Sequence, residues 1–148
     1  MVLTRNILGG LKVEQAFSRG AKQLSPLAPL REAIDLTLNT FQSDFPVCDE
    51  QELVGLLTHV RLVESLNRHG PDIPIGDVML RDVEPISPDE EVLVAQRRLS
   101  ELRIDALPVV QDKVFLGLIT NRDVSEIFRL ASIQADLVLE QLQAPAVT

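Results

Sequence analysis

The sequence predicts an α/β (α+β) fold in which two β-α-β-β-α repeats, related by a pseudo-twofold axis, pack through their sheets. The first observation is an internal repeat, because a shift of 62 residues places residues 13–66 on residues 75–128 without a gap. The second is that apolar runs of strand length and stretches of helical period follow in the same order in both copies. The third is that one copy has too few strands to stand alone, so two copies would bury one continuous core.

The identities between the copies cluster at turn residues, which indicates a duplicated supersecondary unit. The matching positions are Ser25-Pro26 and Ser87-Pro88, Ala33 and Ala95, Pro46-Val47 and Pro108-Val109, Gly55-Leu56 and Gly117-Leu118, and Thr58 and Thr120. The apolar runs between them stay in register, so the two copies are expected to share one backbone course.

The second copy is expected to open with a short strand over residues 83–86. Ser87 is then predicted to cap a helix that has Pro88 at its first position and Glu90 completing a capping box. This helix should run to about Leu102, with an apolar face made of Val92, Ala95, Leu99 and Leu102.

A hairpin follows, with strands at 106–110 and 114–119. A last helix is predicted to begin near Thr120, with an apolar side made of Val124, Ile127 and Phe128. The first copy repeats this order, with strands at 45–48 and 53–57 and a final helix from about Thr58 to Leu66. Its first helix should pack through Leu30, Ala33, Ile34, Leu38 and Phe41.

The repeat divides the chain into five segments. We expect a lead-in over residues 1–12, a first repeat over 13–66, a linker over 67–74, a second repeat over 75–130 and a C-terminal helix or tail over 131–148. Gly70-Pro71 and Pro74 should break regular structure in and around the linker.

Charge and composition limit the classes of function and partner that the chain can have. Residues 1–24 carry +3, which leaves −11 on the remainder of a chain whose net charge is −8. So acidic a body disfavours nucleic acid as a partner, because phosphate contacts dominate that affinity. No apolar run reaches the roughly 18–20 residues that cross a bilayer, so no membrane span is expected. Cys48 is the only cysteine, and we expect it to be a small buried side chain in a reducing, cytoplasmic setting.

The segment from Gly117 to Val124 is the strongest candidate for chemistry. A strand leads there into a helix start, where unpaired N–H groups and the helix dipole favour an anion. The Thr120 hydroxyl suits a phosphate oxygen, and the Asp123 carboxylate, one turn on, suits the two hydroxyls of a ribose. The alternative is that Thr120 and Asp123 form a capping box, which needs no ligand.

These features resemble the CBS domain family, which is marked by an apolar-Pro-Val-Val strand and a Gly-apolar-apolar-Thr-x-x-Asp turn from strand to helix. Here the two marks are Ala106-Leu107-Pro108-Val109 and the segment Gly117–Asp123, and the resemblance covers about residues 13–130. A tandem CBS pair, or Bateman module, implies that AMP, ADP, ATP or S-adenosylmethionine binds in the cleft between the repeats, with no cofactor required.

Carried over by position, the resemblance implies that Thr120 meets phosphate and Asp123 meets ribose. Ala106 and Pro108 would line the adenine pocket, with Ile86 at its edge. Arg122 would contact phosphate, although a solvated helix residue explains it equally well. Because the chain has no Trp or Tyr, adenine is expected to rest on aliphatic side chains and backbone.

The first copy departs from the family pattern, because Thr58 is followed three residues later by Arg61 in place of aspartate. Arginine has no acceptor for a ribose hydroxyl, so we expect one competent site and one degenerate site. A further hypothesis is that Arg61 reaches a phosphate held by the second copy.

The sequence lacks metal-ligand spacing, a nucleophile elbow and a phosphate-binding loop, so a regulatory ligand-sensing module is expected, with no metal site and no enzymatic activity. Its effector should lie outside this chain. Residues 6–13, 40–47 and 75–79 resemble the CBS region of site-2-type membrane zinc metalloproteases, which would make the chain a cytosolic tail. The family resemblance also implies a homodimer. The alternative function is a ligand-free dimerisation or interaction scaffold.

Overall fold

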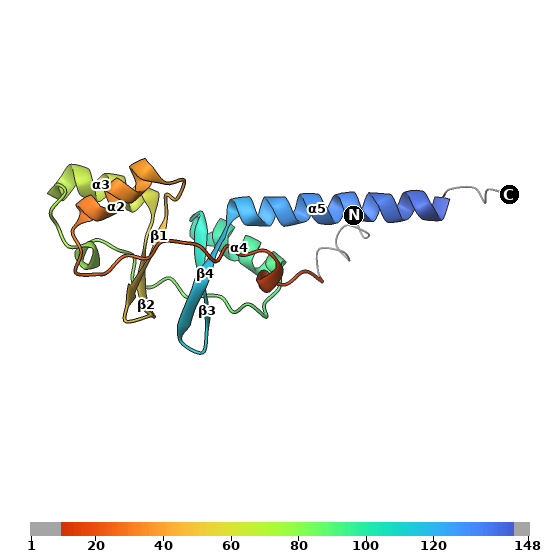
Figure 1. Ribbon diagram of the computed structural model, residues 1–148, viewed down its shortest axis with the longest axis horizontal. Helices are drawn as coiled ribbons and strands as arrows, with labels where there is room; N and C mark the ends of the chain where they lie inside the picture. Colours follow the sequence, from red (N-terminus) through yellow and green to blue (C-terminus); the bar gives the residue numbers. More distant parts are fainter. Residues whose placement is uncertain (1–9, 144–148) are drawn as a thin grey trace.

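The computed structural model describes residues 10–143, in which two similar halves lie side by side and one long helix projects from the second (Figure 1). The first half contains α2 (Leu30–Asn39), β1 (Phe45–Asp49), β2 (Glu52–Leu57) and α3 (His59–His69). The second contains α4 (Val92–Leu102), β3 (Ala106–Gln111), β4 (Val114–Thr120) and α5 (Asn121–Gln143). Most of the expected lead-in and the end of the expected tail, residues 1–9 and 144–148, lie outside the described residues.

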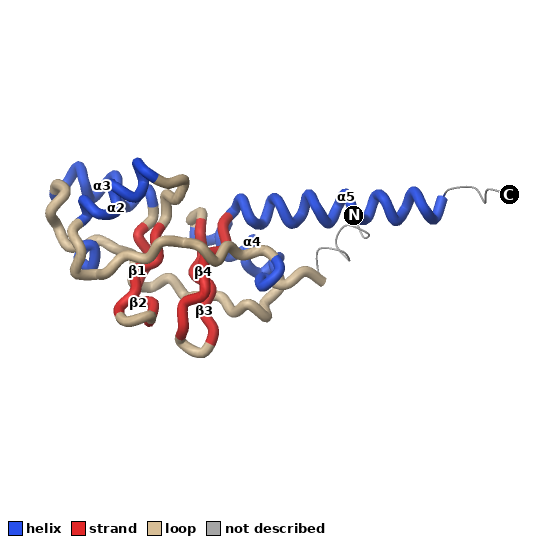
Figure 2. Tube along the Cα trace, in the orientation of Figure 1, coloured by secondary structure: helices blue, strands red, loops and turns tan. Residues whose placement is uncertain are grey.

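Each half is built on one antiparallel hairpin, and the two hairpins stand next to each other (Figure 2). In β1–β2 the register shifts between Val47 and Cys48, and in β3–β4 it shifts between Val109 and Val110. These irregularities lie 62 residues apart, at equivalent positions of the repeat. The predicted pairing of two equivalent α/β units is therefore confirmed.

The expected strand over residues 83–86 is reduced to one bridging residue. Ile86 pairs in parallel with Val109, as Leu24 pairs with Val47 in the first half. Proline stands at positions 85 and 88, on both sides of Ile86, and proline has no N–H to extend a ladder. The prediction of a short strand was wrong in length, although its last residue does pair with the hairpin.

The predicted helix cap at Ser87 was also wrong. Helix α4 begins at Val92, after Glu91, and residues 87–90 form a turn in which the Glu90 N–H donates to the Ser87 carbonyl. The carbonyls of Glu90 and Pro88 accept hydrogen bonds from Val13 and Glu14 of the N-terminal segment. The Val92 N–H, which a helix starting at Pro88 would direct to the Pro88 carbonyl, donates instead to the Leu11 carbonyl at 2.9 Å.

Several residues predicted on buried helix faces are exposed instead. Helix α2 ends at Asn39, so Phe41 lies beyond it and is fully exposed, and Leu38 is exposed near the helix end. Leu102 is the last residue of α4 and is half exposed, since the chain turns there through a left-handed Arg103. The other members of these faces pack as expected: Leu30, Ala33, Val92, Ala95 and Leu99 are buried, and Ile34 is partly buried against the core of the first half.

Each half is completed by a segment that precedes the other half. The 3₁₀ helix Val13–Gln15 lies in the core of the second half, and the 3₁₀ helix Ile75–Asp77 lies in the core of the first. The Val13 N–H donates to the Glu90 carbonyl at 2.8 Å, and the Ile75 N–H donates to the Ala28 carbonyl at 2.8 Å. These equivalent contacts follow the pseudo-twofold relation and hold the two repeats together.

Close backbone approach explains the glycine in each repeat. A Cβ built on Gly117 would lie 2.1 Å from the carbonyl oxygen of Ser18, which pairs with Leu118. A Cβ on Gly55 would lie 2.8 Å from the carbonyl oxygen of Leu80, which pairs with Leu56. Both glycines therefore make room for a backbone segment that crosses the hairpin, around Ser18 for Gly117 and around Leu80 for Gly55. The segment around Phe17 and Ser18 is called the crossing segment.

Besides the core of each half, an apolar cluster lies between the two hairpins and joins them. It comprises Cys48, Leu56, Ala106, Phe115 and Leu118. Both repeats contribute to it, which confirms that they pack through their sheets, and Cys48 is buried as predicted.

Helix α5 is longer than the helix expected within the second repeat, and it continues without interruption through residue 143. Its first turns pack on the second half through Val124, Ile127, Phe128 and Ala131. The rest of the helix leaves the body of the molecule (Figure 1). Leu130, Ile133, Leu137 and Val138 of this helix are exposed apolar side chains. No helix in residues 10–143 combines the length and apolarity needed to cross a membrane.

Candidate functional site

The candidate site is a cavity of about 320 Å³ between the two repeats, at the strand ends far from the hairpin turns. One wall comes from the segment before β1, residues Phe41, Gln42, Ser43 and Asp44. The other comes from the end of β4 and the start of α5, residues Leu118, Thr120, Asn121 and Arg122, with Asp105 from before β3. Both repeats therefore build this cavity.

Thr120 and Asp123 form a reciprocal capping box at the start of α5. The Thr120 N–H donates to Asp123 Oδ2 at 2.9 Å, and the Asp123 N–H donates to Thr120 Oγ1 at 3.1 Å. The cap that the sequence allowed as an alternative is thus present. It satisfies two groups at the helix start and holds the Asp123 carboxylate in one orientation.

The second oxygen of Asp123 is held by a residue that sequence reasoning missed. The Ser18 hydroxyl donates to Asp123 Oδ1 at 3.0 Å from the crossing segment. Nothing in the repeat marks this serine, because its equivalent in the second copy is Leu80. A carboxylate has about four lone-pair positions, so Asp123 keeps acceptor capacity beside both bonds. Asp123 itself is not among the lining residues of the cavity, but it is hydrogen-bonded to Thr120, which is.

Arg122 lines the cavity with a flexible side chain. The side chain is 82% exposed, and its Nε lies 3.9 Å from Glu126 Oε1 on the next helical turn. Exposed pairs of this kind contribute little to stability. The structure therefore places Arg122 at the cavity without fixing its guanidinium there.

The three residues expected around adenine are buried rather than exposed to this cavity. Ala106 belongs to the cluster between the hairpins, and Ile86 belongs to the core of the second half. Pro108 is buried in β3, where its carbonyl accepts from the Ile86 N–H at 2.9 Å. None of them is among the lining residues of the cavity, although Ala106 is the strand partner of Thr120, which is.

Two carboxylates line the cavity that the sequence did not single out. Asp44 is only 8% exposed, and its Oδ1 accepts from the His59 N–H at 2.9 Å. Burial raises the pKa of Asp44 above its ordinary value, and the nearby Asp105 carboxylate raises it further. Asp105 is exposed and accepts at Oδ1 from the Asn121 side chain at 2.9 Å.

The segment before β1 also contributes an aromatic ring and a fixed amide. Phe41 is fully exposed at the cavity, so an aromatic side chain is available where the sequence predicted only aliphatic ones. The Gln42 side chain binds backbone atoms of Lys22 and Asp44, which anchors this wall. The position of this segment in the sequence could have pointed to it. It directly precedes β1, whose start lies across the cavity from the beginning of α5 in the other repeat.

Thr58 and Arg61 of the first repeat lie elsewhere. Thr58 is buried and caps α3 by accepting from the Arg61 N–H at 3.2 Å. The Arg61 Nε donates to the Val78 carbonyl at 2.7 Å, beside a separate cavity of about 240 Å³. The hypothesis that Arg61 reaches a phosphate at Thr120 is not supported by this placement.

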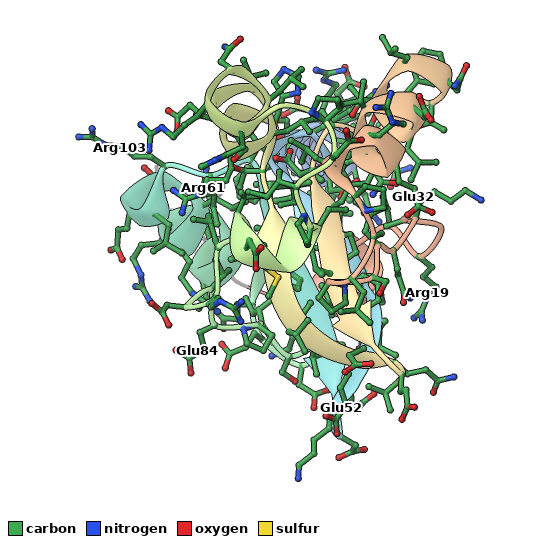
Figure 3. The ribbon with its side chains drawn as sticks, turned by 90° about the vertical axis from the view of Figure 1, so that its left-hand side faces the viewer. Arg19, Glu32, Glu52, Arg61, Glu84 and Arg103 are labelled. Atoms are coloured by element: carbon green, nitrogen blue, oxygen red, sulfur yellow. The ribbon has the colours of Figure 1, made fainter. Side chains whose placement is uncertain are left out.

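Another cavity, of about 490 Å³, opens between the hairpins toward their turns. It is lined in part by Glu52, which lies near the hairpin tips (Figure 3), and by Arg81 and Lys113. None of the predicted ligand residues lines it, and no helix start faces it. Among the described residues, no group of three or more acidic, histidine or cysteine side chains is arranged to hold a metal ion.

Known proteins resemble this chain in both sequence and fold. The CBS domain family model matches residues 13–68 and 75–129. Inosine-5′-monophosphate dehydrogenase of Methanocaldococcus jannaschii is 31% identical over 117 residues, which cover 76% of this chain and 23% of that enzyme. The chain spans less than half the length of the curated relatives it matches.

Solved CBS structures share this arrangement. CBSX2 in complex with AMP has a TM-score of 0.74 and 20% identity, and the match covers 83% of this chain and 99% of that one. The CBS domain pair of protein MJ0100, in complex with 5′-methylthioadenosine and S-adenosyl-L-methionine, has a TM-score of 0.73 and 25% identity, and the match covers 80% and 95%. With both repeats matched by the family model and the pair matched by these folds, this chain belongs to the CBS domain family and is a tandem CBS domain pair, or Bateman module.

Proposed function

We propose that this chain is a regulatory module that binds an adenosine-containing ligand in the cavity between its repeats. The observation that carries the proposal is the fixed Asp123 carboxylate beside a cavity built by both repeats. Related CBS pairs in complex with AMP, or with methylthioadenosine and S-adenosylmethionine, support the ligand class. A ligand that touches both repeats favours one relative arrangement of them, and that differential affinity is the regulatory signal.

Different residues contact different parts of the ligand in this proposal. Asp123 accepts hydrogen bonds from the two ribose hydroxyls, and the Thr120 hydroxyl donates a hydrogen bond to the ligand from the start of α5. The exposed Phe41 ring supplies a face for the purine, since every base has a π-face that can stack on an aromatic side chain. Ala106 and Pro108 lie on β3, which pairs with β4, and with Ile86 beside them they hold the end of β4 that carries Thr120.

One site per chain is expected to bind. In the first repeat Arg61 replaces the aspartate, and its guanidinium is held at the Val78 carbonyl. Arginine has no acceptor for ribose, so Thr58 serves only as a helix cap there. The stoichiometry of binding is therefore one ligand per chain.

The effector lies outside this chain in our proposal. The resemblance of residues 6–13, 40–47 and 75–79 to site-2-type proteases makes a membrane metalloprotease the proposed effector, and the chain its cytosolic regulatory part. The exposed apolar residues of α5, Leu130, Ile133, Leu137 and Val138, support a homodimer.

Calorimetric titration of the purified chain with AMP, ADP, ATP and S-adenosylmethionine tests the proposal. The decisive variant is Asp123→Asn, whose amide oxygen still accepts from the Thr120 N–H but which loses one acceptor for ribose. We expect one ligand per chain and at least about a tenfold loss of affinity in the variant. Its unfolding midpoint serves as the control for the cap.

A ligand-free scaffold is the second candidate. Both Asp123 oxygens already have donors within the protein, and this observation favours it. A scaffold predicts no heat with any adenosine ligand and no thermal stabilisation at millimolar ligand. It also predicts a dimer, measured by light scattering, that is unchanged by every nucleotide.

A further inference from the structure

The charge of the candidate cavity is opposite to what a phosphate requires. Asp44 and Asp105 both line it, and Asp123 stands next to it, against a single lining cation, Arg122. That cation is 82% exposed and lies beside Glu126. A phosphate group placed here would meet like charge on two walls, and like charges repel most strongly where water is partly excluded.

Most backbone N–H groups at the start of α5 already donate hydrogen bonds within the protein. The Thr120 N–H donates to Asp123, the Asn121 N–H donates to the Asp105 carbonyl at 3.0 Å, and the Asp123 N–H donates to Thr120. An anion at a helix start depends on such groups being unpaired. This helix start therefore offers a phosphate much less than the sequence pattern alone implies.

We infer that the cavity selects an adenosine ligand whose 5′ substituent carries no net negative charge, a thioether or sulfonium nucleoside rather than a nucleoside phosphate. This inference rests on the proposed function, and it concerns only which adenosine ligand the site prefers. The ribose and purine contacts are common to all of these ligands, so they do not discriminate. The two carboxylates act on the 5′ substituent alone, attracting a sulfonium or ammonium group and repelling a phosphate.

The test compares 5′-methylthioadenosine, S-adenosylmethionine, AMP and ATP by calorimetry on the purified chain at low and high salt. We expect the two sulfur nucleosides to bind at least about tenfold more tightly than AMP, and ATP to bind least well. The preference should shrink as salt rises, because added ions screen the carboxylates.

Replacing the two carboxylates by amides distinguishes the effect of their charge on ligand preference from their structural role. The double variant Asp44→Asn, Asp105→Asn keeps an amide oxygen for the His59 N–H and for the Asn121 side chain, so both hydrogen bonds survive. We expect its preference to fall by about tenfold, mainly through stronger AMP binding. The control Asp112→Asn removes a carboxylate at the β3–β4 turn, where the left-handed backbone suits asparagine, and should leave the preference unchanged.

Two outcomes count against the inference in different ways. If AMP or ATP binds as tightly as the sulfur nucleosides, or if the double variant keeps the wild-type preference, charge selection is wrong while the proposed function stands. If none of the four ligands binds, the proposed function itself fails and the inference fails with it.

Discussion

Replacing Gly117 by alanine tests the way in which the two repeats are held together. The new Cβ would lie 2.1 Å from the Ser18 carbonyl oxygen and 2.9 Å from Phe17 Cδ2, well inside van der Waals contact. The strand and the crossing segment are joined at this point by two backbone hydrogen bonds, Ser18 to Leu118 at 2.9 Å and Leu118 to Ser18 at 3.0 Å. Neither side can accommodate the methyl group without separating.

The loss of stability can be estimated from the contacts that are broken when the strand and the crossing segment separate. Each of the two hydrogen bonds contributes about 0.5–1.5 kcal/mol. Phe17 and Val13 lie on the same segment in the core of the second half, and moving one of them out of the core costs about 1.5–3 kcal/mol. We therefore expect Gly117→Ala to lower the free energy of unfolding by about 2.5–6 kcal/mol.

Urea unfolding followed by circular dichroism measures this difference, and Gly20→Ala is the matched control. A Cβ at Gly20 would meet no atom within 4 Å, so that substitution should change stability by less than about 1 kcal/mol. Gly55→Ala should fall between them, because its closest neighbour is the flexible Met79 side chain. A Gly117→Ala protein as stable as the Gly20→Ala protein would refute the crossing contact.

Three further predictions concern the core and its titrating groups. Val13→Ala should destabilise the protein by about 1–3 kcal/mol in urea unfolding, since Val13 is fully buried among second-repeat residues, and an unchanged midpoint would contradict its place in that core. Burial raises the pKa of the Cys48 thiol from 9.0 to about 11, so alkylation of the native protein at pH 8 should be about a hundredfold slower than in urea, and equal rates would show that the thiol is accessible. The pKa of Asp44 is raised above 3.8 in the folded state, so its contribution to stability is present below that value and is lost as pH rises through the raised pKa. Asp44→Asn should therefore become more stable relative to the wild type as pH rises through this window, and parallel stability profiles would show that Asp44 is not perturbed.

The hairpins and the central helices could be predicted from the chain because their signals are local. Alternating apolar runs, the prolines at 46 and 108, and apolar spacing in the helices specify these elements whatever surrounds them. The helix start at Thr120 was also visible locally, since threonine followed three residues later by aspartate is a capping pattern. The 62-residue repeat then indicated that two such units form a pair.

The errors arose where a contact with a distant segment overrode a local preference. Ser87 and Glu90 match a helix cap, yet the N-terminal segment takes the carbonyls of Pro88 and Glu90, and α4 begins later. Leu38 and Phe41 continue a helical pattern, yet α2 stops at Asn39 and leaves Phe41 exposed at the cavity. A periodic pattern alone cannot show where tertiary packing ends an element.

The sequence by itself determined the duplicated α/β architecture, the membership of the chain in a paired fold and the position of the Thr120–Asp123 cap, because each depends on residues close together in the chain. Only the tertiary structure decided that the segments at Val13 and Ile75 complete the opposite repeat and that Ser18 holds Asp123. It also decided that Asp44 and Asp105 share a cavity with Thr120. The pseudo-twofold packing brings these residues together across long stretches of chain, and no local pattern records which distant surfaces will meet.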